Sequence, residues 1–153
     1  MVDETAFRET YRDVNECACV FEKTILTRQG DCAMAERFCI AEREGVRCGD
    51  PAAQATCSAF LDWVREQARF ALKETALSER LPHGRAIRIQ VGGIRGLAEA
   101  LQQPVPVQDI HGLLQAALVQ AGDISRLPGT DIVRGVAAYR PKRRRRRRHP
   151  DRD

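Results

Sequence analysis

Apolar residues near the start of the chain recur at alternating steps of four and three, the spacing of a single helical face. Between residues 5 and 28 this stripe consists of Phe7, Tyr11, Val14, Ala18, Phe21 and Ile25. The spacing predicts a helix that ends at Gly30. A short strand over CACVFEKTIL is the alternative, and it is disfavoured because Glu22 and Lys23 are adjacent polar residues.

Two further helices are predicted from the signals at their ends. Asp31 suits the N-cap of a helix over 32–44, and Gly45 suits the position just past its last turn. Asp50 followed by Pro51 is a strong start signal for the next helix. That helix, expected over about 51–77, places these residues on one face: Cys57, Phe60, Leu61, Val64, Ala68, Ala71 and Leu72.

The second half of the chain has another pattern. AIRIQV, residues 86–91, reads as a short strand that enters a Gly-Gly turn. Helices are expected from 94 to about 102 and from 108 to about 120, and a last short helix follows LPGT. The predicted fold class is therefore mainly α. It comprises an N-terminal bundle of about three helices lined by cysteines (1–80), a smaller helical segment with one short strand (81–140), and a disordered Arg-rich tail (141–153).

Composition is that of an ordinary globular protein, with 43% hydrophobic and 30% charged residues. No apolar run approaches the roughly 18 residues of a membrane-spanning helix. The opening MVDETAFRETYRD lacks the basic and apolar regions of a secretory signal. A cytoplasmic location is expected, in which the six cysteines are reduced and serve as ligands or core residues rather than disulfides.

The net charge of +4 arises in the tail. Residues 1–80 hold 11 Lys and Arg against 15 Asp and Glu, whereas residues 141–153 hold 8 against 2. The six consecutive arginines Arg143–Arg148 repel one another and bind phosphates without sequence specificity. They predict electrostatic docking to an acidic protein or to nucleic acid, with a merely solvated tail as the alternative.

All six cysteines lie within the first 57 residues, although a cysteine that only filled a core would also be expected in the later helices. On a continuous helix Cys32 and Cys39 would share one face with Cα atoms roughly 10.5 Å apart. A single zinc ion needs closer ligands, whereas a multi-iron cluster reaches thiolates on successive turns. The spacing CxC-x12-C-x6-C-x8-C-x8-C has no paired CxxC knuckle.

These observations predict an iron–sulfur cluster, with a 4Fe–4S cluster as one candidate type, in a protein of electron transfer or redox sensing. The expected ligands are Cys32, Cys39, Cys48 and Cys57, with Cys17 as the substitute. Cys19 points away from the helical stripe and is expected not to bind the cluster. A redox partner protein is implied.

Other interpretations of the cysteines stay open. They can be reduced core residues in a non-enzymatic adaptor that docks through its Arg-rich tail, a redox-active Cys17-x-Cys19 pair, or ligands of Cu(I). No catalytic constellation supports an enzyme. VGGIRG, residues 91–96, lacks the established nucleotide-binding patterns and reads as a tight turn, and no histidine is paired with a nucleophile.

Overall fold

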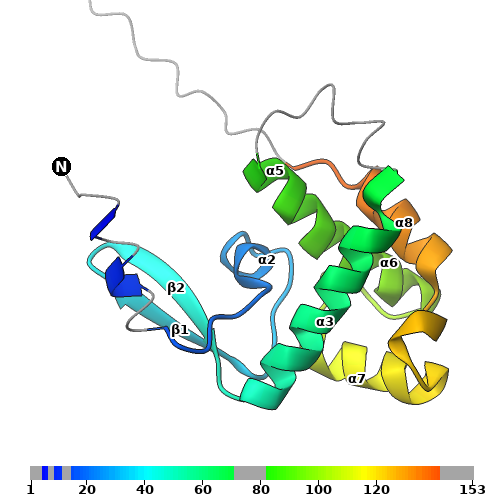
Figure 1. Ribbon diagram of the computed structural model, residues 1–153, viewed down its shortest axis with the longest axis horizontal. Coiled ribbons are helices and arrows are strands. Elements are labelled where there is room, and N and C mark those ends of the chain that lie inside the picture. The colour runs from blue at the N-terminus through cyan, green and yellow to red at the C-terminus, as the bar shows by residue number, and fades with distance from the viewer. Residues whose placement is uncertain (1–4, 7–8, 12–14, 71–81, 142–153) are drawn as a thin grey trace, which may run out of the picture.

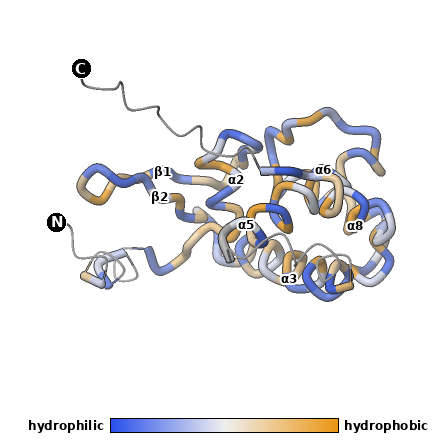
Figure 2. The backbone as a smooth tube through the Cα atoms, turned by 90° about the horizontal axis from the view of Figure 1, so that it is seen from above, coloured by the Kyte–Doolittle hydropathy of each residue, from blue (hydrophilic) through white to orange (hydrophobic). Residues whose placement is uncertain are grey.

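The computed structural model describes residues 5–6, 9–11, 15–70 and 82–141, apart from the side chains of 82 and 83. Its helices and strands are, in chain order, α2 (Glu22–Leu26), β1 (Ala35–Ile40), β2 (Arg43–Cys48), α3 (Pro51–Gln67), α5 (Pro82–Ile87), α6 (Gly93–Ala100), α7 (Ile110–Ala121) and α8 (Gly129–Ala138). A π-helical turn (Arg88–Gly92) joins α5 to α6, and a 3-10 turn (Ile124–Arg126) precedes α8. In Figure 1 the hairpin lies to one side of α3, and α6 and α8 lie to the other, and Figure 2 shows the hairpin and α8 toward opposite ends.

An antiparallel hairpin replaces the helix expected over 32–44. Strands β1 and β2 pair from Ala35↔Cys48 to Ile40↔Arg43, and Ala41 takes a positive φ of 54° in the two-residue turn. Gly45 is a strand residue opposite Phe38, whose ring lies where a Gly45 side chain would begin, within 2.4 Å of the ideal Cβ position. An aromatic ring over a strand glycine is a packing arrangement that only a pleated pair provides.

The segment 17–19 extends this sheet by one short pairing instead of continuing a helix. Ala18 forms an antiparallel bridge with Arg47, the Cys48 N–H donates to the Cys17 carbonyl at 2.7 Å, and the Cys19 N–H donates to the Val46 carbonyl at 3.1 Å. Helix α2 then covers only Glu22–Leu26. The predicted helix over 5–28 is therefore limited to residues 5–6, 9–11 and α2 within the described part of the chain.

The expected strand over 86–91 is helical, as the end of α5 and the π-helical turn. Residues 87–91 alternate between apolar and polar side chains, but Arg88, Ile89, Gln90 and Val91 are all buried, so the alternation does not correspond to one buried and one exposed strand face. The glycines of VGGIRG serve close helix packing. An ideal Cβ on Gly92 would lie 2.6 Å from the Val136 Cα, and one on Gly96 would lie 2.6 Å from the Asp131 carbonyl oxygen.

One hydrophobic core unites the two described halves of the chain. Its members come from before and after the gap at 71–81, and the largest of them are Phe21, Ile25, Phe60, Leu61, Ile94, Leu97, Ile110, Leu114 and Ile132. Gln90 binds the halves together through a buried polar contact, because its Oε1 accepts hydrogen bonds from the Thr24 N–H at 3.3 Å and the Thr24 hydroxyl at 3.2 Å.

The predicted fold class is therefore wrong in its central feature. The N-terminal part is not a bundle of three helices, since a two-stranded antiparallel sheet and the short α2 precede the one long helix α3. Helix α3 begins at Pro51 with Asp50 as its N-cap, as predicted. The predicted boundary at residue 80 and nearly all of the predicted tail, including Arg143–Arg148, lie outside the described residues.

Candidate functional site

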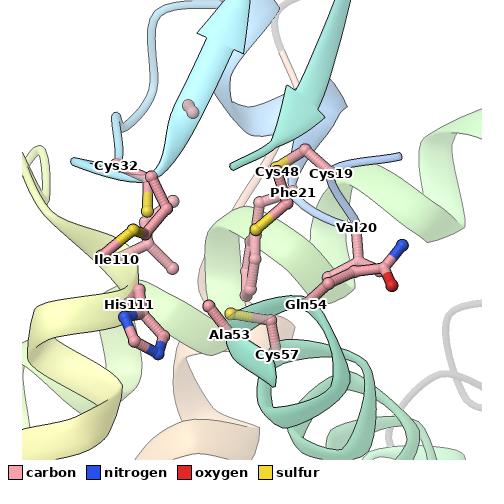
Figure 3. Close-up of a pocket in the computed structure, with 12 residues that line it drawn as sticks. Cys19, Val20, Phe21, Cys32, Cys48, Ala53, Gln54, Cys57, Ile110 and His111 are labelled. Atoms are coloured by element: carbon pink, nitrogen blue, oxygen red, sulfur yellow. The ribbon is translucent and has the colours of Figure 1, made fainter. Parts of the chain in front are cut away.

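Four of the six cysteines line one small pocket. They are Cys19, Cys32, Cys48 and Cys57. Figure 3 shows their side chains around a single space between the base of the hairpin, α3 in green and α7 in yellow. The cysteines therefore form a thiol pocket, and we use this name below for the site that these four residues line.

Each thiol of the pocket comes from a different segment of the chain. Cys19 follows the short strand pairing, Cys32 lies between Gly30 and β1, Cys48 ends β2, and Cys57 lies in the second turn of α3. The rest of the lining is mostly apolar, from Val20, Phe21, Met34, Ala35, Ala53 and Ile110, with Gln54 and His111 as its polar members.

Backbone N–H groups are directed at three of the four sulfurs in the same local geometry. Cys19 receives the N–H of Phe21, Cys32 that of Met34, and Cys48 that of Asp50, in each case from two residues further along the chain. Such donors stabilise a thiolate and tune a metal centre to which the thiolate binds. The same N–H to sulfur arrangement occurs at three separate turns, so it characterises the pocket as a whole and not one loop.

The sulfur of Cys32 also lies at the N-terminus of α7, a helix that is distant in the sequence. The first N–H groups of a helix have no partner within it. In α7 the Ile110 N–H donates to the Asp31 carbonyl at 3.0 Å, the His111 N–H is directed at the Cys32 sulfur, and the side chain of the N-cap residue Asp109 accepts the third. The sulfur therefore completes the cap, in a position where the helix dipole favours negative charge.

In the chain as it stands the four thiols hold their protons. Burial, to which the neighbouring thiols of the pocket add, raises the pKa of Cys19 and Cys57 to about 12. Burial also raises the pKa of Cys32 and of Cys48, against the effect of the N–H donors. The Cys48 S–H donates to the Asp50 carbonyl at 3.1 Å, and the Cys32 S–H lies 3.7 Å from Asp109 Oδ1.

The remaining two cysteines do not line the pocket. Cys39 is exposed near the end of β1, opposite Glu44. Cys17 lies beside Cys48, whose thiol its side chain contacts. Of the expected ligands, the structure therefore brings together Cys32, Cys48 and Cys57, but not Cys39.

Sequence reasoning placed Cys19 outside the site because it treated residues 5–28 as one helix. In an extended segment residues two apart share a face, so the CxC spacing itself places Cys17 and Cys19 on one side of the chain. His111 was also missed as a pocket residue. It is 6% exposed and belongs to the first turn of α7.

As the side chains stand, no three Cys, His, Asp or Glu residues among those described form a group that could hold a metal ion. Nor does any helix in the described ranges have the length and apolar character that a membrane span requires. No known protein family, curated protein or solved structure matches this chain.

Proposed function

We propose that the thiol pocket binds an iron–sulfur cluster through Cys19, Cys32, Cys48 and Cys57, and that the protein acts in electron transfer or redox sensing. The observation that carries this proposal is the convergence of four thiols from four segments on one largely apolar pocket. Compared with the ligand set expected from sequence, Cys19 replaces Cys39.

The need of a single metal ion for closely spaced ligands weighs against a mononuclear site. Thiolates on one tetrahedral zinc ion, with Zn–S bonds of about 2.3 Å, hold their sulfurs roughly 3.8 Å apart. The described thiols form no such group. An iron–sulfur cluster spreads its four cysteine ligands further apart, because each thiolate binds a different iron atom.

The surroundings of the sulfurs fit the same proposal. Four neighbouring thiolates would repel one another, and a bound cationic centre offsets this repulsion, so loading releases protons. The N–H donors from Phe21, Met34, Asp50 and His111 would remain to stabilise the charge on the sulfurs. The buried Phe21 and Ala53 limit the access of water to the pocket.

The proposal is tested on the full chain purified without oxygen, or reconstituted with ferrous iron and sulfide. We expect broad visible absorption that dithionite bleaches, together with bound iron and acid-labile sulfide. Cys19→Ser and Cys57→Ser are expected to lose most of the iron, whereas the matched control Cys39→Ser retains it. A colourless, iron-free protein, or iron retained in Cys19→Ser but lost in Cys39→Ser, contradicts the proposal.

A redox partner protein and a cytoplasmic location belong to this proposal. Docking through Arg143–Arg148 to an acidic protein or nucleic acid concerns residues outside the described part of the chain and stays a prediction. Deletion of 142–153 tests it, since a phosphate-binding tail confers binding that weakens steeply with salt.

A further inference from the structure

Cys17 and Cys48 are directly opposite one another across a short antiparallel pairing. The bridge between Ala18 and Arg47 sets the register, and the Cys48 N–H donates to the carbonyl of Cys17 at 2.7 Å. At a hydrogen-bonded antiparallel position the two Cα atoms are about 5.5 Å apart, and both side chains leave the same face of the sheet.

This separation suits a disulfide bond. Disulfide-bonded cysteines have Cα atoms about 4.4–6.8 Å apart, with a mode near 5.5–6 Å. The two thiols already interact in the reduced chain. Both are partly exposed, so a small oxidant reaches them, whereas Cys57 is buried.

We propose that Cys17 and Cys48 form a reversible disulfide when the metal-free chain meets a peroxide. A bond forms between the two Sγ atoms, and the thiols lose two protons and two electrons. Hydrogen peroxide accepts the two protons and the two electrons and becomes two molecules of water. A dithiol reductant reverses the step by thiol–disulfide exchange.

The disulfide would remove one ligand from the thiol pocket. This consequence rests on the proposed function, because it matters only if Cys48 binds a cluster. Cys17 would then be the disulfide partner of a cluster ligand, placed outside the pocket but next to that ligand, so that oxidation and cluster binding compete for the same sulfur.

The experiment uses the reduced, metal-free full chain treated with hydrogen peroxide and digested with trypsin without reductant. Cleavage after Arg12, Lys23, Arg47 and Arg65 releases Cys17 with Cys19 in the peptide 13–23, and Cys48 with Cys57 in the peptide 48–65. We expect these two peptides to be joined in most molecules and to separate after reduction.

Single variants identify the bond. The linked pair is expected to disappear in Cys17→Ser and in Cys48→Ser and to persist in Cys19→Ser and in Cys57→Ser. A link that survives in Cys17→Ser, or no link in the wild-type chain, overturns the inference. A chain that forms the disulfide but binds no iron contradicts the proposed function alone, and one that binds iron but forms no disulfide contradicts only this inference.

Discussion

The backbone N–H of His111, in the first turn of α7, is directed at the sulfur of Cys32, which lies in the loop before β1. The sulfur therefore caps the N-terminus of a helix that is distant in the sequence, because it accepts one of the helix's first N–H groups. This contact also connects α7 to the thiol pocket. The charge on the Cys32 sulfur and the position of α7 therefore depend on one another.

A proline at position 111 tests this relationship, because proline removes the N–H and is tolerated in the first turn of a helix. For a cluster-loaded protein we expect His111→Pro to weaken metal retention by about 10–100-fold, the usual effect of losing a group that supports a metal ligand. Competition with a chelator measures this loss. The matched control His111→Ala keeps the N–H and is expected to change retention much less. Equal losses in both variants would assign the effect to the imidazole.

Stability of the metal-free, reduced protein is expected to fall at alkaline pH. Burial raises the pKa of Cys19 and Cys57 from an ordinary value of 9.0 to about 12. Between these values the folded chain holds more protons than the unfolded chain, so the free energy of unfolding decreases as pH rises. Below pH 9 the contribution is fully present.

Urea unfolding across this pH range measures the slope. Cys57→Ala is expected to make the alkaline decrease shallower, and the exposed Cys39→Ala is expected to leave it unchanged. A stability that does not vary with pH in this range, or the same slope in Cys57→Ala as in the wild-type chain, would contradict the burial of this thiol.

The helix contact at Gly135 is expected to tolerate no side chain. An ideal Cβ there would lie 2.3 Å from the Gly92 carbonyl oxygen, so α8 would have to move away from the π-helical turn. Overpacking of this kind costs about 1–3 kcal/mol, and Gly135→Ala should lower the free energy of unfolding by about this amount.

Gly84 provides the matched control for that substitution, since an ideal Cβ at this α5 position meets nothing within 4 Å. Gly84→Ala should be neutral or stabilising, by up to roughly 1 kcal/mol, because alanine loses less backbone entropy in a helix than glycine. Denaturant unfolding of both variants decides the point. Similar stability changes in the two variants would refute the close packing of α8.

The sequence by itself determined the features that depend on local chemistry. Asp50 and Pro51 start α3 as predicted, because a capping carboxylate and a proline act within one turn. The apolar face predicted over 108–120 corresponds to α7, which covers Ile110–Ala121. The concentration of thiols before residue 58 also pointed to the half of the chain that supplies the thiols of the pocket.

Only the tertiary structure decided the features in which two patterns compete. Residues 32–44 have the end signals of a helix in Asp31 and Gly45, but cross-strand packing of Phe38 over Gly45 stabilises a hairpin instead. Residues 87–91 have the alternating period of a strand, but they are helical, and the polar members find partners inside the protein: Arg88 donates to the Ala137 carbonyl and Gln90 accepts from the Thr24 hydroxyl.

The same limit applies to the thiol pocket. Whether Cys19 or Cys39 lines it depends on which face of an extended segment meets α3 and α7. Sequence spacing cannot decide this, because the choice is made by contacts between segments that are distant along the chain.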